Sequence, residues 1–339
     1  MFKAARLKQL GYLALGTAMT VLLLAWAFRD VHWAAVWQTF RQADWGWLGL
    51  GWLAYLLSYG MRAQRTQTLM AAVDQRGQFQ TYLAAAFVGF GASCLLPSYV
   101  GEVVRAAIPA RLDKVAFEAV FGSIVAERIL DLGVVFLFLL LPVWAGLLPE
   151  GAWLNLPIGW MGGAILLAWL LLLAAASFPK RLGDLAVVLC RHLKLGRFEA
   201  KLADSLGQFL KGLTALRQPG RCGVALFETA AVWGLNALTY WAGFRAFGLD
   251  APGYAGALFT QSVAALAVVL PTTPGYVGAF EAGIRLALGL YELPIDVILA
   301  YAMALRVVMF VTTPIVGLMV AASLGLSKAE LVPRSAGRR

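Results

Sequence analysis

The sequence predicts an all-α membrane protein: a polytopic helical bundle of six full spans and two re-entrant helical hairpins that together form an inverted repeat. Two observations predict this class. Of the 339 residues, 61% are hydrophobic and only 14% are charged, with a mean hydropathy of +0.75. A short phrase with proline and glycine also occurs twice, each time where an apolar segment breaks. Backbone groups in lipid must pair internally, and the alternating pattern of a β-barrel is missing, so we expect helices.

A helix needs about 20 residues to cross the core of a bilayer, and we compare the apolar segments with that length. Several are shorter than that, so the alternative to hairpins is a bundle of about eight ordinary spans. Between the first two segments, Trp33 and Trp37 stand one helical turn apart, which predicts a short helix in the membrane interface. The candidate segments are 11–28, 45–59, 82–96, 132–148, 158–178, 224–247, 255–270 and 297–324.

Basic residues gather between some of these segments, whereas the opposite connections are balanced or acidic. The positive-inside rule therefore predicts a bacterial cytoplasmic (inner) membrane protein with both termini in the cytoplasm. We interpret the net charge of +10 as a face toward anionic lipid, not as a nucleic-acid site. Residues 179–221 are predicted to be a basic, amphipathic cytoplasmic linker whose helix ends at Pro219-Gly220. The basic groups are Lys3, Arg6 and Lys8, then Arg62, Arg65 and Arg76, then Lys180, Arg181, Arg191, Lys194, Arg197, Lys201, Lys211, Arg217 and Arg221.

The repeated phrase reads Leu-Pro-Ser-Tyr-Val-Gly-Glu at 96–102 and Thr-Pro-Gly-Tyr-Val-Gly-Ala at 273–279. Charge counting places the first hairpin on the cytoplasmic side and the second on the outer side, so the two copies are inverted. The repeat elements cover about 79–148 and 252–325, within a single transmembrane domain at 1–330. Paired breaks at matching places in two halves of a membrane protein indicate a substrate site. The tail at 331–339 is predicted to be disordered, and its start resembles part of a protease-cleavage tag.

Each phrase begins a helix that soon carries a Glu and an Arg on one face: Glu102 with Arg105, and Glu281 with Arg285. The start of such a helix directs unpaired N–H groups and a positive dipole end at the break, which suits an anionic group such as phosphate. Glycine there allows a close approach of the backbone. The candidate substrate-binding residues are Tyr99, Gly101, Glu102, Arg105, Glu127, Arg128, Asp131, Pro274, Gly275, Tyr276, Gly278, Glu281, Arg285 and Arg306.

Charged residues also lie inside apolar segments, where each costs roughly 2.5–3.5 kcal/mol on insertion scales. Glu127 and Asp131 share a helix face, and Arg128 is spaced to pair with Asp131. These three side chains could form internal ion pairs as readily as a ligand site, and Arg128 could reach the interface. Arg306 has no acidic neighbour in 297–324, so it needs a partner from elsewhere or a ligand. For Tyr99 and Tyr276, packing is as good an interpretation as binding.

Several classes of enzyme find no support in the sequence. Cys94, Cys190 and Cys222 are isolated, and His32 and His192 are the only histidines, so we expect no histidine-rich metal site and no Ser-His-Asp triad. No glycine-rich phosphate loop is present, which argues against ATP-driven pumping by this chain alone. We therefore expect neither a cofactor nor a bound metal.

The motifs resemble those of the lysylphosphatidylglycerol synthase transmembrane-region family, also called flippase-like. Residues 96–105 with Glu127-Arg128-Ile129-Leu130-Asp131 are similar to its first signature, and residues 274–281 with Arg306 to its second. Ser98 stands where we would expect a glycine. The resemblance implies an inner-membrane protein that moves or handles lipids. Some members carry a fused transferase domain, which is absent from this sequence, so lysyl-lipid synthesis by this chain alone is not expected.

Two functions from different classes follow. The first is a lipid transporter: an anionic phospho- or polyisoprenyl-lipid headgroup is held by Arg128, Arg306 and the half-helix ends, while acidic residues of the motifs gate it or accept protons. The second is a membrane-embedded transferase or hydrolase that uses carboxylates as general base. A third, weaker reading is an accessory subunit of a lipid-modifying enzyme. The expected partners are membrane lipids, with a second copy of the chain or such an enzyme as further candidates. The acidic residues of the first function are Glu102, Glu281 and Asp131.

Overall fold

A computed structural model describes residues 19–29, 31–73, 77–96, 99–149, 163–164, 167, 169–171, 199–269 and 274–325. These residues form helices joined by turns, and no strand occurs among them. The predicted all-α class is therefore confirmed. The segment 158–178 and the tail at 331–339 lie mostly or wholly outside these ranges, as do Arg76 and the first part of the basic linker, 179–198.

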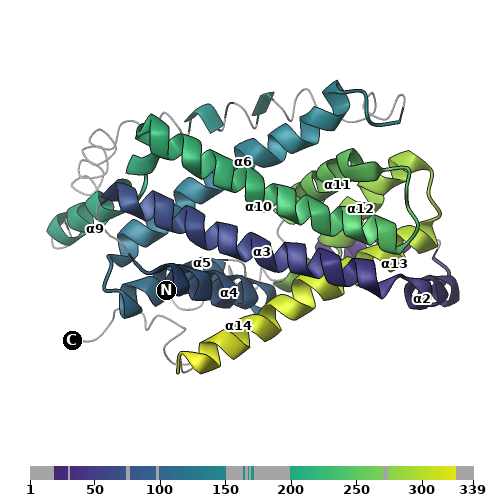
Figure 1. The fold of residues 1–339 in the computed structure, drawn as a ribbon, viewed down its shortest axis with the longest axis horizontal. Coiled ribbons are helices and arrows are strands. Elements are labelled where there is room, and N and C mark those ends of the chain that lie inside the picture. Colours follow the sequence, from purple (N-terminus) through teal and green to yellow (C-terminus); the bar gives the residue numbers. More distant parts are fainter. Residues whose placement is uncertain are drawn as a thin grey trace, which may run out of the picture.

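Long helices give the molecule its long axis (Figure 1). α3 (Trp45–Met70) lies antiparallel to α10 (Pro219–Ala246), and α6 (Phe117–Trp144) packs against both. Each is roughly 40 Å long at 1.5 Å per residue, which exceeds the bilayer core of about 30 Å. The last long helix runs from α13 (Ile295–Arg306) through a π-helical turn (Val307–Val311) into α14 (Thr312–Ser323). By length and composition, 219–246 and 295–323 are apolar enough to cross a membrane.

Two pairs of shorter helices accompany the long ones. α4 (Phe79–Leu95) packs against α5 (Tyr99–Leu112), and α11 (Gly253–Ala267) packs against α12 (Ala279–Leu288). Each is shorter than the 20 residues or so that a span requires. The two pairs lie toward opposite ends of the long axis, with α4 and α5 on the left of Figure 1 and α11 and α12 on the right.

The connections within these pairs coincide with the repeated phrase, and the second connection lies against the end of α4. The second phrase forms a 3₁₀ turn at Pro274–Tyr276 that contacts α4. Gly275 has a φ of +76°, and a Cβ on it would lie 3.4 Å from the carbonyl oxygen of Cys94. Such a conformation favours glycine. Two segments far apart in the sequence therefore come together where both helix pairs break.

Glycine also sets the distances between α4 and its neighbours. A Cβ on Gly101 would lie 2.3 Å from the Gly89 carbonyl oxygen, and one on Gly317 would lie 2.7 Å from the Phe87 carbonyl oxygen. α4 is therefore held closely between α5 and α14. The largest apolar core is elsewhere, around Phe244 and Tyr301, where α10, α12 and α13 meet.

One predicted span was too short, and this changes the assignment of two arginines. The expected segment 45–59 is the first part of α3, which continues to Met70. Arg62 and Arg65 therefore lie inside this helix and are buried, not in a connection between spans. The apolar pattern of the sequence stops at these charges, so the predicted span stopped there too. The pattern cannot show that another helix places carboxylates near these arginines.

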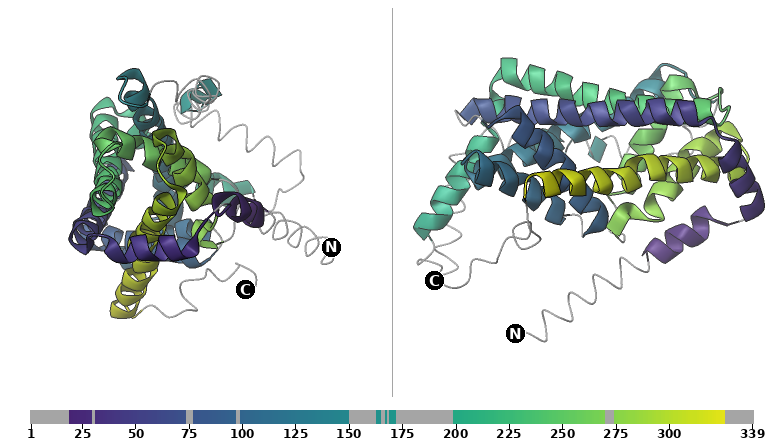
Figure 2. Two further views of the ribbon diagram at one scale, coloured as in Figure 1. Left: turned by 90° about the vertical axis from the view of Figure 1, so that its right-hand side faces the viewer. Right: turned by 60° about the horizontal axis from the view of Figure 1, so that its bottom comes forward.

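The peripheral elements agree with the predictions in part. The predicted interfacial helix is α2 (Trp33–Gln42), with Trp33 and Trp37 both exposed. Residues 19–29, which include the end of the first predicted segment, lie beside α2 and contact the start of α12 (Figure 2). The linker helix is described only as α9 (Glu199–Gly212). Pro219-Gly220 begins α10 and does not end the linker helix, because proline suits a first helical turn.

We expect Gly317→Ala to destabilise the protein by about 1–3 kcal/mol, because the added methyl group pushes α14 away from the α4 backbone. Reversible unfolding in mixed detergent measures this free energy. Gly60→Ala in α3 is the control, since nothing lies within 4 Å of its Cβ position. Equal stabilities of the two variants would contradict the close α4–α14 crossing.

Candidate functional site

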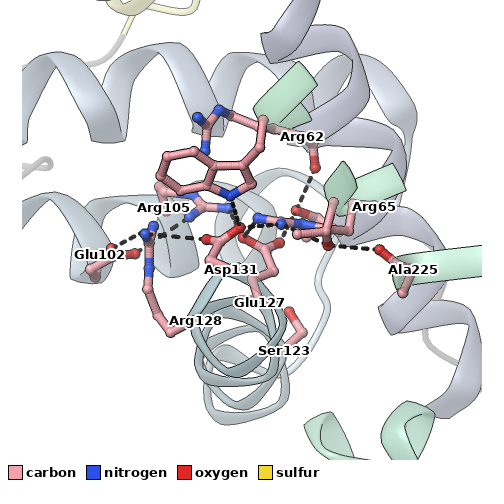
Figure 3. Close-up of polar contacts among 12 residues, drawn as sticks. Arg62, Arg65, Glu102, Arg105, Ser123, Glu127, Arg128, Asp131 and Ala225 are labelled. Carbon is pink, nitrogen blue, oxygen red and sulfur yellow. Dashed lines mark hydrogen bonds and ion pairs between the residues drawn. The ribbon is translucent and has the colours of Figure 1, made fainter. Parts of the chain in front are cut away.

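A buried arginine joins three long helices. The side chain of Arg65 on α3 is fully buried, and its NH1 lies 2.6 Å from Asp131 Oδ1 while its NH2 lies 3.1 Å from Glu127 Oε2. Both carboxylates come from successive turns of α6, as their spacing predicts. NH1 also donates to Thr229 Oγ1 of α10 at 3.0 Å. Figure 3 shows this guanidinium directed at the two carboxylates.

Glu127 in turn ties α5 to the same site. Arg105 of α5 places NH2 2.7 Å from Glu127 Oε2, and the Thr66 hydroxyl donates to Oε1 at 2.5 Å. Gly89 on α4 makes room for Arg105, because a Cβ there would lie 2.1 Å from Arg105 Cγ. A buried carboxylate that receives this many charge-assisted hydrogen bonds is held in a single position.

Arg128 is the member of the site with the most exposed side chain, at 41%. Its NH2 lies 3.0 Å from Glu102 Oε1, and its NH1 lies 3.4 Å from Asp131 Oδ2. The predicted pairing with Asp131 is therefore confirmed. Glu102 also lies 3.4 Å from Arg105, and Asp131 accepts a hydrogen bond from Trp233 Nε1 at 2.9 Å. The first turn of α5 is thus linked to α6 through these ion pairs.

Arg62 differs from the other arginines. It is buried, yet within the described ranges its guanidinium makes no ion pair and no hydrogen bond. It lies over the ring of Phe90 at 4.8 Å and over that of Tyr59 at 5.9 Å. Phe90 also faces Arg105 at 4.9 Å and Arg128 at 5.8 Å, so three guanidinium groups surround one ring. Contacts of this kind give about 0.5–2 kcal/mol each but do not neutralise charge.

We name these seven side chains the arginine cluster. Four arginines face three carboxylates, so the cluster has one positive charge in excess when all seven are ionised. Its members are Arg62, Arg65, Arg105, Arg128, Glu102, Glu127 and Asp131.

Arg306 lies at the second break, and its partner comes from α12. Its Nε pairs with Glu281 Oε1, its NH1 donates to the Gly275 carbonyl at 2.8 Å, and its NH2 donates to that of Tyr276 at 3.4 Å. The partner missing from 297–324 is therefore Glu281. The other oxygen of Glu281 accepts from Gly278 N at 2.9 Å, so the start of α12 is already capped by its own side chain.

Three further candidate residues make contacts within the protein. Arg285 does not pair with Glu281; it donates to the carbonyls of Trp26, Ala27 and Arg29 instead, because α12 packs against the end of residues 19–29. Gly101 serves the close packing of α4 and α5. Tyr276 packs its ring against Phe310, at 5.9 Å between centroids.

Two candidate residues are described by backbone alone. Tyr99 begins α5 and Pro274 begins the 3₁₀ turn, while the side chains of both lie outside the described set. In the part of the chain that the structure describes, no group of histidine, cysteine or acidic side chains is arranged to hold a metal ion.

The sequence prediction missed Arg62, Arg65, Phe90 and Trp233. One signal could have found the arginines: Glu127 and Asp131 share a helix face and need more positive charge than Arg128 supplies. Arg62 and Arg65 are three residues apart at the end of an apolar segment, so both fall on one face of a helix that extends that segment. Nothing in the sequence points to Phe90 or Trp233.

Comparison with protein families gives one match. The model described as "Lysylphosphatidylglycerol synthase TM region" matches residues 13–317 of this chain. The match covers both helix pairs and both arginine sites. Comparison with curated proteins gives no match.

We expect Arg65→Ala to destabilise the protein by about 3–5 kcal/mol, because it leaves two buried carboxylates without their shared cation. Unfolding in mixed detergent measures the change. Arg217→Ala removes the same charge from an exposed position and should have an effect near zero. A loss below 1 kcal/mol in Arg65→Ala would contradict the central place of this residue.

A double-mutant cycle of Arg306→Gln and Glu281→Gln should give a coupling energy of roughly 1–3 kcal/mol, since the two groups are in direct, mostly buried contact. The exposed pair Arg245 and Asp250 is the matched control and should give less than about 1 kcal/mol. Additive effects at Arg306 and Glu281 would show that the pair does not contribute as a unit.

Proposed function

Because the chain belongs to the lysylphosphatidylglycerol synthase TM region family, we propose that it binds an anionic lipid headgroup at the arginine cluster and moves it between leaflets. Membership of this family makes the chain a membrane protein of lipid metabolism or transport. The headgroup site and the transport of the headgroup between leaflets are what we propose beyond family membership. They require no cofactor and no catalytic step.

The observation that carries the proposal is Arg62. A buried guanidinium without an anion is costly, and charged groups at membrane depth normally face each other or a polar cavity. All the carboxylates of the cluster already have arginine partners, so none is left for Arg62. One negative charge from outside the protein would complete the set.

The chemistry of the cluster favours a phosphate group. Guanidinium forks match phosphate oxygens in pairs, and Arg is preferred over Lys at such sites for this reason. Arg128 and Glu102 are the more exposed members, at 41% and 24% of their side chains, so a headgroup would enter on their side. There it would compete with Glu102 for Arg128.

The arrangement of the helix pairs supports movement between leaflets. We propose that α4–α5 and α11–α12 are re-entrant hairpins that enter from opposite sides, so that six spans and two hairpins form an inverted repeat. The opposite positions of the pairs along the long axis and the contact of the second break with α4 support this. The orientation with both termini in the cytoplasm rests on the charge pattern.

Arg306 would then serve the second half of the path. It holds Glu281 just as Arg128 holds Glu102: in each half, an arginine of the following long helix pairs with a glutamate of the second short helix. A headgroup that leaves the arginine cluster would meet an equivalent ion pair at the other break. Glu102, Glu281 and Asp131 are the groups that it would displace.

We expect Arg62→Gln to weaken binding of an anionic phospholipid by about 10- to 100-fold, the effect of losing one charge-assisted contact. Because Arg62 has no carboxylate partner in the described structure, the variant strands no buried anion and should fold. Binding is measured with the purified chain in nanodiscs, and headgroup translocation in liposomes that contain a labelled phospholipid.

Arg217→Gln removes an exposed charge and should leave both measurements unchanged. Translocation should be lost in Arg306→Ala. If Arg62→Gln binds and translocates the labelled lipid as well as the parent chain does, the cluster is not the headgroup site. Chemical turnover of the lipid without translocation would favour a membrane-embedded enzyme instead.

A further inference from the structure

One further buried acid lies beside the arginine cluster without belonging to it. Glu228 of α10 is 4% exposed, and its Oε1 accepts a hydrogen bond from Thr68 Oγ1 at 2.9 Å. Its other oxygen, Oε2, is buried and has no donor among the described residues. An ionised carboxylate in this position would carry an uncompensated charge, which is costly.

Among the described residues, no positive group forms an ion pair or a hydrogen bond with Glu228. From α3 it faces Arg65, whose NH1 and NH2 are already bonded to Asp131 and Glu127, and from α6 it faces the like charge of Glu127. Arg221 lies two turns earlier on α10, about 10 Å along its axis. Arg217, in the turn before α10, is exposed, and α11 contains no charged residue.

A cavity lies on the other side of Thr68, the hydrogen-bond partner of this acid. It has a volume of about 330 Å³ and is lined by Gln64, Gln67, Thr68, Ala71 and Arg221. Thr68 both lines the cavity and donates to Glu228. Four of the five lining residues have polar side chains, and the cavity is large enough for water, so protons have a route as far as Thr68, which donates to the carboxylate.

We propose that Glu228 binds one proton on Oε2 through this cavity and that this proton switches the charge of the neighbouring arginine cluster. A proton from water adds to the carboxylate and forms the neutral acid, and no other bond changes. With Glu228 ionised, four carboxylates balance the four arginines. With Glu228 protonated, the excess of one positive charge is free to attract an anion.

The coupling to lipid rests on the proposed function, whereas the proton site does not. If an anionic headgroup binds the arginine cluster, linkage requires that proton and headgroup each favour the binding of the other. The headgroup would then carry a proton with it, and the pH on the side of the cavity would set the occupancy of the site.

The proton site is tested by infrared difference spectra of the purified full chain in nanodiscs, taken between mildly alkaline and mildly acidic pH. The parent chain should show a protonated-carboxyl band that is lost in Glu228→Gln and kept in Glu118→Gln, a half-exposed control on α6. Glu228→Asp should move the band without removing it, so a Glu228→Gln variant that fails to fold still leaves a test. A band that is unchanged in both Glu228 variants overturns the proposal.

The coupling is tested with a fluorescent anionic phospholipid titrated into the same samples. Affinity of the parent chain should rise by about tenfold from the alkaline to the acidic condition, and Glu228→Gln should bind tightly at both. A pH slope that persists in Glu228→Gln overturns the switch but leaves the proposed function intact. Absence of lipid binding at every pH, with the band still lost in Glu228→Gln, overturns the headgroup site and the coupling but not the proton site.

Discussion

The structure depends on the guanidinium of Arg65, which lies between Glu127 and Asp131 and bonds to α10 through Thr229. These contacts are buried, so removal of any one of the three charged partners upsets the charge balance of the interior. The same carboxylates position Arg105 and Arg128, and through them the first turns of α5. The short helix α5, next to the first break, is thus held in position by an ion-pair network that centres on Arg65 of α3.

The two breaks are built alike but differ in charge. At the second break, Arg306 and Glu281 form a pair, and Arg306 also donates to the carbonyls of Gly275 and Tyr276. At the first break, the corresponding Arg128–Glu102 pair is joined by the arginines of α3 and α5. Among these described side chains, the arginine cluster at the first break therefore has one arginine more than carboxylates, whereas Arg306 and Glu281 balance. An anion would be attracted to the first site and would have to displace a carboxylate at the second.

The sequence predicted those features that depend on composition and on spacing within one segment. The helical class, the two breaks and the Arg128–Asp131 pairing are of this kind, because each follows from residues close together in the chain. The tertiary partners could not be predicted. A hydropathy pattern ends at Arg62 and Arg65, although the acidic face of another helix allows α3 to continue past them. Likewise, Arg285 contacts carbonyls more than 250 residues away, which no local pattern encodes.

The contacts of Arg306 connect charge to backbone conformation. The turn that it holds contains Gly275 and Tyr276, both at positive φ, and conformations of this kind persist only when surrounding contacts maintain them. Arg306 provides two of those contacts by donating to the carbonyls of the same two residues. Its guanidinium has a fixed set of donors, so it cannot hold the turn and also engage a phosphate with the same N–H groups. Under the proposed function, a headgroup that took these two N–H groups from the carbonyls would release the turn, so binding of the anion and movement of the break would be one event.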